Sequence, residues 1–196
     1  MNGQWMMSYT GMNSKADADK FIAVYPDGTG FGPFLTWNAG GPSWGRPNDV
    51  KFLTSLVDDV GTRIAVDQRR VYATGLSNGG MMSYRLALEA SGRIAAIAPI
   101  AGTMLVRDQV PTRAVPVMHF HGTADRIVPP GGPSAGTPSF VSFLSVAETL
   151  QLWCQFNRCD FNDLAGNQLI DRVFDGTRVR KIRYRAAADG ADVVYI

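Results

Sequence analysis

A serine in a glycine-rich turn is the most chemically informative feature of the chain. Residues 75–80 read Gly-Leu-Ser-Asn-Gly-Gly, which matches G-x-S-x-G, a pattern that places a serine on a sharp strand-to-helix turn. Small residues two positions before and after let strand and helix approach closely, so the hydroxyl of Ser77 would project over the carboxyl ends of the strands. The start of the helix points free N–H groups at the same spot, and the amide of Asn78 is a candidate oxyanion donor. The pattern predicts nucleophilic acyl chemistry; the alternative is a turn that serves packing alone.

An aspartate and two histidines lie close together later in the chain and could complete such a site. His119 falls in an apolar, strand-like run, and His121 and Asp125 follow it. Asp125 is the candidate acid, because a carboxylate can hold an imidazole in one tautomer and stabilise its charged form; alternatively it bonds only its own turn. His121 is a candidate substitute base if the fold brings it within about 3 Å of Ser77. His119 is more typical of a histidine satisfied in the core.

Strand-like and helical runs alternate along the chain, which predicts an α/β fold with helical crossovers. Helices are expected at residues 50–64 and 78–90 and after residue 145, where Ser145 and Glu148 have the spacing of a capping box. Strands are expected at residues 21–25, 70–76, 94–100, 115–120, 179–185 and 192–196. The chain of 196 residues is long enough for one domain with a core and short for two, so residues 1–196 are predicted to form a single domain.

A long loop precedes the predicted nucleophile. Residues 27–46 are rich in glycine and proline, and a loop of that length in a compact domain usually has a function. It should lie at the carboxyl edge of the sheet, where open α/β sheets bind ligands. Trp37, Asn38 and Trp44 are therefore candidate substrate-binding residues, suited to an aromatic acyl group or a polymer surface. With equal weight, both indoles could cap the core.

Composition excludes several other classes of protein. The longest apolar run, residues 94–101, is too short to span a membrane, and no signal peptide opens the chain. A net charge of +2, with basic residues clustered only at residues 172–185, gives no reason to expect nucleic acid as a partner. Two cysteines, Cys154 and Cys159, are too few for a disulfide scaffold or a four-thiolate zinc site, and no metal site is predicted. A single bridge between them and two buried thiols both remain open.

Five stretches together resemble the polyhydroxybutyrate depolymerase and feruloyl esterase family of α/β-hydrolases, namely residues 24–30, 37–41, 66–87, 94–102 and 116–129. The resemblance implies a three-layer sandwich, a mostly parallel sheet with helices on both faces. It also implies secreted ester hydrolases that use no metal or cofactor and act on polyesters or plant-wall phenolic esters. By motif, Ser77 resembles the nucleophile, Asp125 the triad acid and the Asn78 amide part of the oxyanion hole.

The chain departs from this family at both ends. It begins just after the point where the family has a His-Gly loop that supplies a second oxyanion amide. It stops at Ile196, before the segment that carries the family's catalytic histidine. Cys159 resembles a family cysteine whose downstream partner is replaced here by the Arg-Ala-Ala-Ala of residues 185–188. We therefore expect a member that lacks its first strands and its terminal histidine, and loss of a triad residue leaves only about 10³–10⁴-fold acceleration over water.

Two functions of different kinds follow from these patterns. The first is a serine carboxylic-ester hydrolase that forms an acyl-enzyme on Ser77, with a feruloyl, acetyl or hydroxyalkanoate ester as substrate. The second is a non-catalytic remnant that binds polysaccharide or polyester through the loop of Trp37. A serine peptidase of the oligopeptidase type ranks last, because the chain lacks the large accessory domain of those enzymes. An incomplete sheet edge also predicts a homo-oligomer that covers it.

Overall fold

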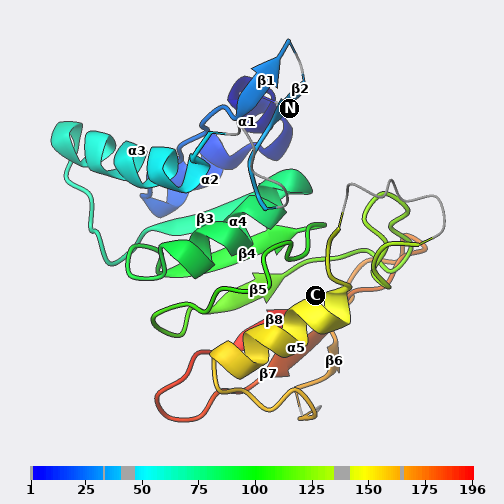
Figure 1. The fold of residues 1–196 in the computed structure, drawn as a ribbon. Helices are drawn as coiled ribbons and strands as arrows, with labels where there is room; N and C mark the ends of the chain where they lie inside the picture. The colour runs from blue at the N-terminus through cyan, green and yellow to red at the C-terminus, as the bar shows by residue number, and fades with distance from the viewer. Residues whose placement is uncertain (1, 33, 41–46, 135–141, 164–165) are drawn as a thin grey trace.

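A six-stranded mixed sheet forms the centre of the protein (Figure 1). The computed structural model describes residues 2–32, 34–40, 47–134, 142–163 and 166–196. The strand order is β3 (Tyr72–Leu76), β4 (Ala96–Ile100), β5 (Val117–His119), β8 (Val193–Tyr195), β7 (Arg180–Tyr184) and β6 (Gln168–Leu169). The first four strands run parallel, and β7 and β6 are antiparallel additions. This arrangement confirms the predicted α/β class with a mostly parallel sheet.

Three longer helices accompany the sheet, and local sequence signals define where they begin. They are α3 (Asp49–Arg63), α4 (Asn78–Glu89) and α5 (Val146–Phe156). The side chain of Asn48 caps α3 by accepting a bond from the Lys51 amide. Ser145 and Glu148 form the predicted capping box at the start of α5. No helix in the described part of the chain is long and apolar enough to cross a membrane.

The core lies between one face of the sheet and the helices α4 and α5. Ile97, Val117 and Val193 occupy neighbouring positions on that face and are almost fully buried. The rings of Tyr84 in α4 and Trp153 in α5 are in contact, with centroids 5.4 Å apart, so both helices pack on this face of the sheet. Side chains alternate between the faces of a sheet, which leaves a second set of residues pointing the other way.

The second face of the sheet is exposed in its centre. Tyr72, Ile100 and Met118 point to this face with 65%, 40% and 40% of their surface accessible. Residues beside them in register, such as Ala98, are only half-buried. Within the described residues, the helix cover that we predicted for both faces is therefore seen on one face, and the centre of the other face carries exposed apolar side chains.

The N-terminal residues differ most from the sequence expectation. They form the helices α1 (Gly3–Thr10) and α2 (Met12–Asp19) and a hairpin of β1 (Thr29–Phe31) and β2 (Phe34–Thr36), which lie at the β3 end of the sheet in Figure 1. The strand predicted at residues 21–25 is wrong, because Phe21, Ile22 and Val24 are exposed and belong to no strand. An apolar run becomes a strand only when a neighbouring strand accepts its backbone hydrogen bonds. None of the described strands pairs with this segment.

Candidate active site

Ser77 occupies a strained turn between β3 and α4. Its backbone angles, φ 55° and ψ −117°, are rare for any residue other than glycine. A conformation of this kind costs on the order of 1–3 kcal/mol and persists only where the surroundings enforce it. The enforcing contacts are the bond from the Ser77 amide to the Ile100 carbonyl, 2.8 Å, and the bond from the Met81 amide to the Ser77 carbonyl, 3.0 Å. The predicted strand–turn–helix context of the serine is thus present.

Close backbone packing explains the glycines around this turn. A Cβ on Gly75 would lie 2.5 Å from the backbone carbon of Gly79, and one on Gly102 would lie 2.3 Å from the carbonyl oxygen of Ser77. A Cβ on Gly80 would come within 3.0 Å of two carbonyl oxygens. Gly79 itself has open space where a side chain would be. Sequence reasoning missed Gly102, because it lies 25 positions after Ser77 and no local pattern connects the two.

Asn78 holds the neighbouring loop against the turn. As the first residue of α4, its N–H has no acceptor within the helix, so it remains available as an oxyanion donor. Its carboxamide accepts a bond from the Trp37 amide at 2.6 Å and donates one to the Trp37 carbonyl at 3.1 Å. The Trp37 indole is half-buried and stacks on Phe52 of α3, with centroids 6.4 Å apart. This second task of Asn78 had no signal in the sequence.

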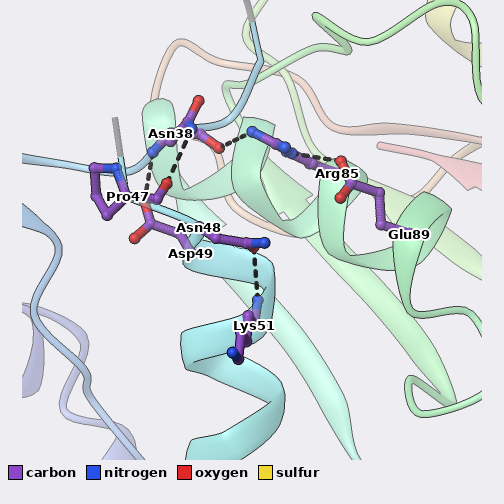
Figure 2. Close-up of polar contacts among 7 residues, drawn as sticks. All are labelled: Asn38, Pro47, Asn48, Asp49, Lys51, Arg85 and Glu89. Atoms are coloured by element: carbon purple, nitrogen blue, oxygen red, sulfur yellow. Dashed lines mark hydrogen bonds and ion pairs between the residues drawn. The ribbon is translucent and has the colours of Figure 1, made fainter. Parts of the chain in front are cut away.

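Asn38 belongs to a cluster of polar contacts between its loop and the helices α3 and α4, which Figure 2 shows. Its amide donates to the Asp49 carboxylate at 2.6 Å, its side chain donates to the Pro47 carbonyl at 3.0 Å, and its carbonyl accepts a bond from Arg85 at 2.6 Å. Asn38 and Asp49 are 5% and 3% exposed. These contacts anchor the loop to α3 and α4, and substrate binding by Asn38 stays a prediction. Trp44 lies outside the described residues.

Asp125 follows β5 and uses one carboxylate oxygen to order its own turn. Oδ1 accepts bonds from the amides of Ile127 at 2.8 Å and Val128 at 3.0 Å. Oδ2 lies 3.6 Å from Nε2 of His121. The turn role is therefore present, and a catalytic role for the second oxygen stays a prediction.

The two histidines are buried and hydrogen-bonded to one another. His121 Nε2 lies 2.8 Å from the Val128 carbonyl oxygen, and its Nδ1 lies 3.1 Å from His119 Nε2. His119 Nδ1 lies 2.9 Å from the Tyr84 hydroxyl. Burial, followed by the neighbouring His121, lowers the pKa of His119 from 6.5 to about 3. His119 is thus the satisfied core histidine that we predicted. Within the described residues, no hydrogen bond joins the Ser77 hydroxyl to either imidazole.

Cys154 and Cys159 are free thiols. Cys154 is fully buried, and burial raises the pKa of its thiol. The Cys159 thiol donates to the Ala191 carbonyl at 3.2 Å. Across the described ranges, no group of three His, Cys, Asp or Glu side chains is arranged to hold a metal ion.

Comparisons with known proteins give a consistent result. The model of the phospholipase/carboxylesterase family matches residues 45–151, just over half of the chain. The chain is 32% identical over 125 residues to a bifunctional acetylxylan esterase/xylanase of Neocallimastix patriciarum, covering 63% of this chain and 17% of that protein. It is 30% identical over 151 residues to feruloyl esterase B of Piromyces equi, covering 72% and 27%. It is 27% identical over 193 residues to feruloyl esterase D of Neurospora crassa, covering 97% and 57%. The chain therefore spans little more than half of these relatives at most.

Proposed function

The chain belongs to the phospholipase/carboxylesterase family, and from that premise we propose that it is a serine hydrolase of carboxylic esters with Ser77 as the nucleophile. The observation that carries the proposal is the backbone of Ser77, whose φ of 55° and ψ of −117° present a hydroxyl at the start of α4. A turn that served packing alone would adopt these angles at lower cost with glycine. Strain at a serine is typical of functional sites.

The chemistry assigned to this site is acyl transfer. The Ser77 hydroxyl loses its proton to a base as its oxygen bonds to the ester carbonyl carbon, and the alkoxide leaves with that proton. Water then hydrolyses the acyl-enzyme. The Asn78 amide stabilises the negative oxygen of the tetrahedral intermediate, and such a donor is worth about 10²–10³ in rate. Asp125 Oδ2 orients the base.

The general base is the triad member with the weakest support from the contacts of the described residues. His121 is the candidate within the chain, and it would have to exchange its bond to the Val128 carbonyl for one to Ser77. The alternative is a histidine from a second copy or from residues beyond these 196. Such a group would have a place beside Asp125, because the end of β8 meets the same loop through the bond from the His121 amide to the Ile196 carbonyl, 3.0 Å.

The proposed substrates are feruloyl or acetyl esters, with hydroxyalkanoate esters as a third class. Support comes from the names of the relatives, which are acetylxylan and feruloyl esterases. The backbone of the half-buried Trp37 is bonded to the Asn78 side chain, which places this aromatic residue in the loop held against the Ser77 turn. Action outside the cell is part of the same proposal.

A fluorophosphonate probe tests the nucleophile without requiring full turnover. We expect covalent labelling of the folded chain at Ser77 and none in Ser77→Ala, with p-nitrophenyl acetate and methyl ferulate hydrolysis lost in parallel. Ser83 provides a matched control, because this second serine lies in α4 and bonds the Gly79 carbonyl. Ser83→Ala should label normally. An unlabelled but folded wild-type chain would contradict the proposal.

A binding remnant is the second candidate, favoured by the engagement of both His121 nitrogens in other hydrogen bonds. It predicts saturable binding to xylan or polyester that Ser77→Ala leaves unchanged and Trp37→Ala weakens. Binding with this pattern, together with no labelling at Ser77, would replace the hydrolase proposal.

A further inference from the structure

We propose that His121 is a positioning residue for Asp125, held in one tautomer by a buried hydrogen-bond chain that begins at Tyr84. This inference rests on the proposed function, since it concerns the acid of that site. Tyr84, His119 and His121 come from α4, β5 and the loop after β5. All three are buried, and Tyr84 and His119 are 1% and 0% exposed.

The last acceptor of this hydrogen-bond chain, the Val128 carbonyl, fixes the direction of each bond before it. The Val128 carbonyl can only accept, so His121 Nε2 must carry a hydrogen and donate across the 2.8 Å contact. In neutral His121, Nδ1 then accepts from His119 Nε2 at 3.1 Å. Since burial keeps His119 neutral, its Nδ1 accepts from the Tyr84 hydroxyl at 2.9 Å. Burial raises the pKa of Tyr84 well above its ordinary value, so the hydroxyl keeps its proton.

Val128 connects this chain to the acid. Its carbonyl accepts from His121 and its amide donates to Asp125 Oδ1 at 3.0 Å. Both the carbonyl and the amide of Val128 are therefore hydrogen-bonded, and the turn cannot shift without breaking one of these two bonds. With Oδ1 fixed, Oδ2 is the oxygen that remains for a base. The Nε2–H of His121, 3.6 Å from Oδ2, places a positive dipole end beside the carboxylate.

The hydrogen bonds of His121 are incompatible with a role as the general base. A general base must present an unprotonated nitrogen to Ser77. Here Nε2 carries the proton that binds Val128, and Nδ1 faces the core and accepts from His119. The other titratable groups that the described residues bring near these three side chains are Asp125, Tyr195 of β8, whose ring centroid lies 5.9 Å from that of His119, and the buried Cys154, which interacts electrostatically with Tyr84.

Imidazole nitrogen NMR can read the tautomers directly, because the chain has only two histidines. We expect each ring to carry its hydrogen on Nε2. In Tyr84→Phe, which keeps the ring and removes the hydroxyl, His119 Nδ1 loses its donor, so its nitrogen shift should move while the hydrogen stays on Nε2, because the contact to the Val128 carbonyl sets the direction of the other bonds. A hydrogen on Nδ1 of His121, or rapid averaging of its two tautomers in the wild type, would overturn the inference.

Hydrogen exchange of the Val128 amide tests the link to the acid. His121→Leu removes the donor to the Val128 carbonyl, and we expect exchange at Val128 to accelerate about tenfold or more. His121→Gln, whose amide nitrogen can still donate to that carbonyl, should retain protection. Unchanged Val128 exchange in folded His121→Leu would overturn the inference.

Ser77 labelling then separates positioning from simple support of the fold. We expect the maximal labelling rate at saturating probe to fall in His121→Leu and recover in His121→Gln, with the concentration for half-maximal rate unchanged. If neither the wild type nor the variants label, the proposed function fails while the tautomer and exchange results still decide this inference.

Discussion

Acid should destabilise this protein through one buried histidine. The folded state holds His119 neutral with a pKa of about 3, because its side chain is buried and His121 lies beside it. In the unfolded chain the pKa returns to about 6.5. The unfolded state therefore binds more protons than the folded state between pH 6.5 and 3, and stability falls as the pH decreases through that window.

The size of the effect follows from the two pKa values. Between pH 6.5 and 4.5 the unfolded histidine goes from half to almost fully protonated, while folded His119 stays neutral. Linkage then gives a loss of about 2 kcal/mol in the free energy of unfolding over this interval. That is a large part of the roughly 5–15 kcal/mol that stabilises a typical domain.

Urea unfolding monitored by tryptophan fluorescence at pH 6.5, 5.5 and 4.5 measures this loss. The window ends at pH 4.5 because carboxylates with lowered pKa values, such as Asp192 and Glu148, add losses of the same sign below it. His119→Gln keeps a donor and an acceptor but cannot titrate, so its loss should be smaller by about 2 kcal/mol. Equal losses in wild type and His119→Gln would refute the reasoning.

Three further predictions follow from the turn and the sheet. Ser77→Gly should raise the free energy of unfolding by about 1 kcal/mol, since glycine adopts φ 55° without strain. A lower free energy of unfolding for this variant, measured in urea, would contradict the prediction. Gly75→Ala should lower the free energy of unfolding by roughly 1–3 kcal/mol, because the new Cβ would meet the Gly79 backbone. Gly79→Ala places its Cβ in open space within a helix and should raise the free energy of unfolding by about 0.5–1 kcal/mol. Equal shifts of the melting temperature in the two variants would count against the packing argument. Exposure of Tyr72 on the edge strand β3 predicts self-association in light scattering that Tyr72→Lys reduces, and a wild type that is monomeric at all concentrations would exclude it.

Local signals in the sequence predicted the elements that local physics decides. The helix expected at residues 50–64 is observed as Asp49–Arg63, and the capping box at Ser145 is formed. The strand and helix around Ser77 were predictable because G-x-S-x-G restricts a short piece of backbone. In each case the residues that define the element lie within a few positions of one another.

Features that depend on distant partners were not predictable. Residues 21–25 have the composition of a strand, but strand formation depends on pairing that no local pattern encodes. The bond between Asn78 and Trp37 joins residues 41 positions apart, and the Tyr84–His119 bond joins residues 35 positions apart. The first depends on how the loop after β2 packs against the start of α4, and the second on how α4 packs against β5.

The turn at Ser77 bears on the choice between hydrolase and binding remnant. The contacts of Gly75, Gly80 and Gly102 force a left-handed backbone at position 77 whether or not the residue there reacts. Glycine would satisfy that backbone without strain, and the hydroxyl of Ser77 has no hydrogen-bond partner among the described residues that would make it useful for stability. Among the described residues, the Ser77 side chain therefore adds backbone strain and no hydrogen bond that offsets it. A serine that strains the backbone where glycine would not, at the start of a helix whose first amides have no acceptor within the helix, favours the proposed reaction at that hydroxyl over polymer binding elsewhere on the surface.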